Sequence, residues 1–171
     1  MDQQLRSAFL EGMSRAATFV AVATTDGPAG RFGVTISSVT SVSADGDHPS
    51  LLACVHQSSP VGAAILANRM FCINLLQEGQ RTISDLFAGR QTPGEHHTRF
   101  DLIPWHAGSL SQPVLEGATA NFECQVATSV LWETHHVIIG RVKDVRLSSD
   151  PAALLYGSRA YKRAIEIPST T

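Results

Sequence analysis

The chain has 171 residues, a formal net charge of -2, and 43% hydrophobic against 16% charged residues. Its 13 lysines and arginines form no basic run, which excludes a surface that tracks a nucleic-acid backbone. No apolar stretch approaches the roughly 18 residues of a membrane-spanning helix, and no secretory leader is evident. We therefore expect one cytoplasmic domain over residues 1–171, with part of its apolar surface covered by a second subunit.

Helix and strand patterns alternate in the N-terminal half. Leu5, Phe9 and Met13 recur at four-residue spacing, which predicts an amphipathic helix over residues 1–17. A β-rich apolar run over 18–25, a glycine- and proline-containing turn, and an alternating segment over 32–37 predict a hairpin. Two further strands are predicted over 51–56 and 70–76, separated by a helix over 61–68 that follows Ser59 and Pro60.

A long hairpin dominates the C-terminal half. A short helix over 82–87, closed by Gly89 as a left-handed cap, precedes a polar loop over 91–99. Only Glu133-Thr134 separates the strand-like segments 118–132 and 135–147, which predicts that they pair. Asp150-Pro151 predicts the start of a last helix. Hairpins with irregularly placed helices indicate a mainly β fold, an antiparallel barrel with peripheral α-helices.

Residue spacing excludes several kinds of site. Gly27, Gly30 and Gly33 give GxxGxxG before a strand, which is not the GxGxxG that opens a Rossmann helix. The histidines show no HxH, HExxH or Cys/His spacing, so no metal site is expected. The three cysteines lie in apolar runs, which indicates buried thiols in a reducing compartment. His135 and His136 are neighbours on a strand, so their side chains point to opposite faces and at most one serves a given site.

Three short segments are candidates for binding a ligand. Thr35 and Ser37 share one face of a strand and offer hydroxyls to a flat polar ligand, although threonine also suits an ordinary strand. Ser58 and Ser59 precede a helix whose free N–H groups favour a phosphate, although they also suit plain N-capping. Arg90 follows a helix end, where it can pair with a phosphate or remain solvated.

Read together, these segments resemble the short-chain flavin reductase family, which includes the reductase components of two-component flavin-dependent monooxygenases. The resemblance covers most of the chain and implies a split β-barrel of the Greek-key, FMN-binding type, a homodimer, and a flavin near the subunit interface. It rests on the following segments in order: 33–39, 49–55 with Ser58-Ser59, 71–74, 87–90, Arg99-Phe100, 113–118, 122–124, His135 before Gly140-Arg141-Val142, and Leu154-Leu155-Tyr156 with Arg159 and Tyr161.

The resemblance also implies which residues meet the cofactors. For FMN or FAD, it implies that the ring and ribityl chain meet the hydroxyls of Thr35, Ser37 and Ser38. The backbone of Ala53, Cys54 and Val55 is expected to line the ring. The phosphate is expected to be held by Ser58, Ser59, Phe87, Ala88 and Arg90. NADH or NADPH is expected beside His135, the histidine of the family's Gly-Asp-His or Gly-Thr-His motif, with Arg159 and Tyr161 as further substrate-binding residues. Glu133 stands where that motif has glycine.

The implied activity is NAD(P)H-dependent reduction of FMN or FAD by hydride transfer, which supplies reduced flavin to a monooxygenase. Two alternatives remain open. One is a flavin-binding protein without efficient nicotinamide turnover, because Glu133 adds negative charge where the nucleotide approaches. The other is a flavoprotein reductase of a larger substrate such as a cobalt corrinoid, with the 91–99 loop as its cover.

Overall fold

The computed structural model describes residues 2–94 and 97–168, so residues 95 and 96 of the predicted 91–99 loop lie outside the described residues. Its helical elements are α1 (Gln3–Ser14), α2 (Pro60–Asn68), α3 (Arg81–Phe87) and the 3-10 turns η1 (Glu78–Gln80) and η2 (Arg99–Leu102). Its strands are β1 (Thr18–Phe19), β2 (Ala21–Thr25), β3 (Phe32–Ile36), β4 (Val39–Ser43), β5 (Ser50–His56), β6 (Met70–Leu75), β7 (Trp105–Ala107), β8 (Pro113–Leu115), β9 (Ala120–Trp132), β10 (His135–Leu147), β11 (Leu154–Gly157) and β12 (Ala160–Arg163).

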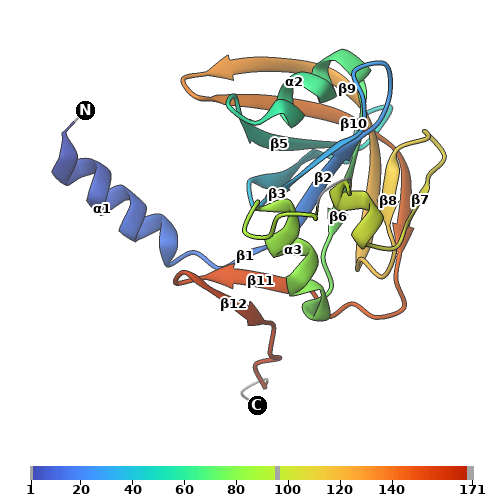
Figure 1. Cartoon of the computed structure of the whole chain (residues 1–171). Coiled ribbons are helices and arrows are strands. Elements are labelled where there is room, and N and C mark those ends of the chain that lie inside the picture. Colours follow the sequence, from blue (N-terminus) through green and yellow to red (C-terminus); the bar gives the residue numbers. More distant parts are fainter. Residues whose placement is uncertain (1, 95–96, 169–171) are drawn as a thin grey trace.

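Most strands belong to one antiparallel sheet in the order β3-β2-β6-β9-β10-β5-β4, which curls around a core (Figure 1). Its two edge strands, β3 and β4, are consecutive in the chain and are joined through Ser37 and Ser38. The Cys54 N–H donates to the Ser38 carbonyl at 2.9 Å, which ties this connection to β5. The mainly β, split-barrel fold with peripheral helices is therefore confirmed.

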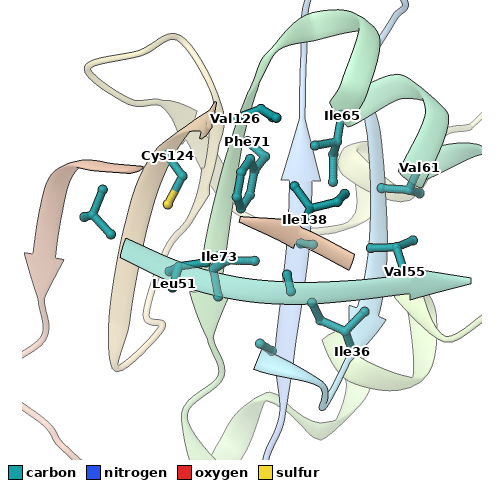
Figure 2. Close-up of a cluster of buried hydrophobic side chains, with 14 residues drawn as sticks. Ile36, Leu51, Val55, Val61, Ile65, Phe71, Ile73, Cys124, Val126 and Ile138 are labelled. Atoms are coloured by element: carbon teal, nitrogen blue, oxygen red, sulfur yellow. The ribbon is translucent and has the colours of Figure 1, made fainter. Parts of the chain in front are cut away.

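Strand β2 forms a wall between two cores, because successive side chains of a strand face opposite sides. Ala21 and Ala23 face the barrel core, whose larger members are drawn in Figure 2: Ile36, Leu51, Val55, Phe71, Ile73 and Ile138. Val20, just before the strand, and Val22 face a second core under α3: Leu76, Leu86, Phe87, Phe100, Leu115 and Leu154. This double covering explains why every residue of β2 is buried.

The predicted long hairpin is confirmed as β9 and β10, with register shifts between Ile139 and Gly140 and between Val142 and Asp144. Helix α1 is also confirmed, but it ends at Ser14 and has no buried residue. Figure 1 shows that it projects away from the rest of the chain. None of the described helices has both the length and the apolar character that crossing a membrane requires.

The predicted helix after Asp150-Pro151 is wrong, because this part of the chain forms the β11–β12 hairpin. Asp150 Oδ1 accepts the Ala152 N–H at 3.0 Å and closes a turn instead of capping a helix. The Leu154 N–H then donates to Leu76, and its carbonyl accepts the Val20 N–H, at 2.8 and 2.9 Å. These long-range backbone bonds hold the segment extended against its local pattern.

The predicted continuous strand over 18–25 is divided at Val20. β1 pairs with β11, whereas β2 pairs with β3 and β6. The Val20 N–H donates to the Leu154 carbonyl, and the Val20 carbonyl accepts from the Leu76 N–H, so the chain passes from one sheet to the other at this residue.

Candidate functional site

Strand β3 lies at an edge of the seven-stranded sheet and carries Thr35, and the other two predicted flavin hydroxyls, Ser37 and Ser38, follow it in the connection to β4. Because β2 is its one partner in that sheet, a row of backbone N–H and C=O groups on its other side is available to a ligand. Gly33 faces the Phe87 ring, and the Thr35 hydroxyl donates to the Ser84 carbonyl at 2.8 Å. The Thr35 hydroxyl therefore fixes α3 beside β3 and keeps its oxygen as an acceptor for a ligand.

Two cavities flank β3 and meet at Ala88, which lines both. The first has a volume of about 360 Å³ and lies between β3, the start of α2 and the end of α3; its lining includes Arg31, Gly33, Ser59, Phe87, Gly89 and Arg99. The second, of about 200 Å³, is lined in part by Thr35, Ser37, Ser84, Arg90, Tyr156 and Tyr161. We refer to the two cavities together as the β3 groove.

The start of α2 forms one end of the first cavity. Ser59 caps the helix through a long 3.4 Å hydrogen bond from the Val61 N–H, and Pro60 occupies the first helical position. The first N–H groups of a helix lack intrahelical partners and carry the positive end of its dipole, so this end suits an anionic group. Ser59 lines the cavity, whereas the Ser58 hydroxyl lies 2.8 Å from His56 Nδ1.

The end of α3 forms the facing wall. Gly89 has φ 74°, which lets the chain leave the helix, and Arg90 then turns back to donate to Asp85 Oδ1 at 2.9 Å. The Tyr161 hydroxyl donates to the same oxygen at 2.7 Å. This hydrogen bond, supported by Arg90, lowers the pKa of the Asp85 carboxyl. Arg90 therefore reaches the groove paired with a carboxylate, which reduces its net positive field.

The two predicted substrate residues of the C-terminal hairpin lie in different places. Tyr161 lines the second cavity, with its ring centroid 5.3 Å from that of Tyr156, and burial raises the pKa of its hydroxyl. Arg159 lies in the β11–β12 turn, where it pairs with Glu11 of α1 at 2.9 Å. The structure therefore brings Tyr161 to the β3 groove and places Arg159 against α1.

The backbone residues predicted to line the flavin lie at the gap between the two sheet edges and line neither cavity of the groove. The side chains of Ala53 and Val55 are buried in the barrel core, so a ligand can meet only their backbone. Cys54 is half-buried, which corrects the expectation of three buried thiols, and burial raises the pKa of its thiol. Ser38 accepts the Cys54 N–H and closes this gap at one end.

His135 and His136 point to opposite faces of the sheet, as predicted. His136 packs against α2, where a Cβ on Gly62 would lie 2.8 Å from its ring. His135 is in register with His56, and their rings are edge to face with centroids 4.8 Å apart. Because His56 also contacts Ser58, direct contacts connect His135 to the start of α2.

The sequence indicated no role for two arginines that line the first cavity. Arg31 lies 4.3 Å from the centroid of the Trp105 ring and pairs with Asp26 at 2.7 Å. Arg99, the last residue of the predicted 91–99 loop, begins η2. Arg31 belongs to no motif and Arg99 only to the Arg99-Phe100 segment, which indicated no role for it; the packing of η2 beside β3 brings both residues to one cavity. Residue spacing in the sequence therefore did not predict that two arginines line this end of the groove.

Comparison with known families and proteins gives one consistent match. The family described as "Flavin reductase like domain" matches residues 13–164. The chain is 38% identical over 164 residues to a protein of Pseudomonas syringae pv. syringae named FMN reductase (NADH) RutF, covering 96% of this chain and 88% of that protein.

Solved structures agree with this match. A putative flavin reductase of Haemophilus somnus superposes with a TM-score of 0.84 at 30% identity, covering 92% of this chain and 98% of that one. BorF, described as the flavin reductase component of a bacterial two-component tryptophan halogenase, superposes with a TM-score of 0.83 at 28% identity, covering 95% of this chain and 99% of that one.

Proposed function

Because the chain belongs to the flavin reductase-like domain family, we propose that it transfers hydride from a reduced nicotinamide to FMN or FAD bound in the β3 groove. A bound flavin supplies the hydride acceptor at its N5 atom, so the protein needs no nucleophile or acid-base cluster. The observation that carries the proposal is the groove itself, where an open strand edge, hydroxyls, a helix N-terminus and arginines meet. Residues 1–171 are then one flavin reductase-like domain.

We assign the phosphate end of the flavin to the first cavity. Ser59 and the free N–H groups of α2 offer donors there, and Arg99 adds positive charge beside Arg31, which is paired with Asp26. The flavin ring then follows β3 toward Thr35 and Ser37, with the backbone of residues 53–55 beyond it. In this direction the ring meets Thr35 and Ser37, and the phosphate meets Ser59 and the arginines of the first cavity.

We place the nicotinamide beside His135, with Tyr161, which lines the second cavity, as a second contact. Glu133 adopts φ 50°, the left-handed conformation that glycine favours, so the turn that presents His135 has a glycine-like backbone although the residue carries a side chain. The negative charge of Glu133 remains the argument for a flavin-binding protein with poor nicotinamide turnover. The comparisons do not favour that alternative or a corrinoid substrate, since the relatives are named for NADH and flavin.

We expect the purified protein to oxidise NADH or NADPH only in the presence of FMN or FAD, with a turnover number on the order of 10 s⁻¹. The measurement is nicotinamide absorbance against time for the four pairs of nucleotide and flavin. Correctly folded protein that oxidises no nicotinamide with either flavin would contradict the proposed function. Flavin binding without such oxidation would instead support the non-turnover alternative.

We further propose that the reduced flavin serves a separate monooxygenase component. The support is the likeness to BorF, which is described as the flavin reductase component of a bacterial two-component tryptophan halogenase. We also propose a cytoplasmic location, for which the three free thiols are the support, since a reducing compartment keeps cysteines unpaired.

We propose that the protein forms a homodimer in which α1 packs on the partner. The side chains of Leu5, Phe9 and Met13 form a stripe on α1 and are 65%, 63% and 57% exposed in the protomer. An isolated helix of 12 residues is marginal in water, so this stripe needs a covering surface. The salt bridge between Glu11 and Arg159 leaves the apolar stripe uncovered.

Phe9→Asp is expected to weaken the homodimer at least about tenfold, because it places a carboxylate in the apolar stripe. Sedimentation equilibrium measures the dissociation constant, and Ser7→Asp on the same helix is the control, because it makes the same change of charge at an exposed position away from the stripe. Equal dissociation constants for Phe9→Asp and the wild type would contradict a role of α1 in the interface.

A further inference from the structure

His56, the last residue of β5, contacts Ser58 ahead of α2 and His135 at the start of β10. Its Nδ1 atom lies 2.8 Å from the Ser58 hydroxyl and 3.1 Å from the Ser58 backbone nitrogen. Its ring lies edge to face against His135, with centroids 4.8 Å apart and planes at 78°. His56 belongs to none of the segments that carry the family resemblance.

The contact with Ser58 fixes the turn that leads into α2. A backbone N–H can only donate, so Nδ1 of His56 accepts this bond and the proton of the neutral ring lies on Nε2. The Ser59 N–H also donates to the His56 carbonyl at 2.9 Å. His56 thus holds the backbone of both serines in place ahead of the helix N-terminus.

The second contact of His56 is with the imidazole ring of His135. His135 begins β10 beside the Glu133-Thr134 turn, and its Nδ1 lies 3.0 Å from the Thr134 hydroxyl. His56 is directly opposite in the β5–β10 register, so both side chains lie on the same face of the sheet. The edge-to-face packing therefore restricts the orientation of the His135 ring.

We propose that His56 is a positioning residue that acts in two directions. Its Nδ1 atom organises Ser58 and Ser59 for the flavin phosphate, and its ring orients His135 for the nicotinamide. This inference rests on the proposed function, because it assumes that flavin and nicotinamide occupy these two places. The two actions use different parts of one side chain, so substitutions can separate them.

Two substitutions divide the roles. His56→Asn keeps an acceptor for the N–H two residues ahead, as asparagine does in an Asx turn, but removes the ring. We expect it to raise the KM for NADH about fivefold, the scale of one aromatic pair, and to leave the flavin Kd within about twofold. His56→Phe keeps a ring against His135 but removes the acceptor. We expect it to raise the flavin Kd about fivefold, the scale of one hydrogen bond, and to leave the KM for NADH within about twofold.

The experiment measures the flavin Kd by fluorescence quenching and the KM for NADH in steady state, with His48→Asn as a control at an exposed histidine that contacts Lys143. Opposite selectivity of the two variants supports the proposal. Equal changes in both constants for both variants, or no change in either, would overturn it. If the wild type binds flavin but oxidises no NADH, the proposed function fails, while the flavin Kd of His56→Phe still tests the role at Ser58.

Discussion

Asn74→Leu is expected to lower the free energy of unfolding by about 3–5 kcal/mol, because it removes a fully buried hydrogen-bonding centre. Asn74 Nδ2 donates to the Val22 carbonyl at 3.0 Å and to the Thr24 hydroxyl at 3.1 Å. Its Oδ1 accepts from the Leu115 N–H at 2.9 Å and from Asn121 Nδ2 at 2.8 Å. One side chain therefore connects β2, β6, β8 and β9.

Leucine has a similar size, so the loss comes mainly from buried polar groups that lose a partner, each costing about 1–3 kcal/mol. For a chain of this length, 4 kcal/mol corresponds to a decrease in Tm of roughly 8–16 °C. Chemical denaturation measures the change, with Gln57→Leu as the control at an exposed amide. A loss below about 1 kcal/mol would show that the neighbouring groups find other partners.

Elements with local signals were predictable from the sequence. Ser59-Pro60 marks the start of α2, Gly89 marks the end of α3, and Glu133-Thr134 marks the turn of the long hairpin. Elements that are held in place by residues distant in the sequence were not predictable. The short strand β8 contains Pro113 and is anchored by Asn74, and the last hairpin is held by Leu76 and Val20, so neither has a signal in its own residues.

In the candidate site too, some features were predictable from the sequence and others were not. Strand parity predicted that Thr35 and Ser37 share a face and that His135 and His136 do not, because side-chain direction on a strand follows from residue number. The contacts of His56 with His135 and of Thr35 with Ser84 depend on register and helix packing, which no local pattern encodes. Residue order therefore indicated the members of the site but not their partners.

Gly33→Ala is expected to weaken flavin binding at least about tenfold, because Gly33 lets α3 lie close to β3. A Cβ at this position would lie 2.5 and 2.8 Å from two atoms of the Phe87 ring and 3.3 Å from Phe100. Phe87 is 1% exposed and belongs to the second core, so its ring has little room to retreat. Overpacking of this kind costs about 1–3 kcal/mol and moves α3 away from β3, together with Ala88 and Arg90.

The backbone of Gly33 is not in the left-handed region, so space and not conformation requires glycine there. The flavin Kd of Gly33→Ala is therefore expected to improve when Phe87→Leu is added, because the smaller side chain makes room for the new methyl group. The coupling between the two substitutions is measured as a double-mutant cycle. Gly12→Ala, whose Cβ meets nothing within 4 Å, is the control for the same chemical change. A folded Gly33→Ala protein with unchanged flavin Kd would place the flavin outside the β3 groove.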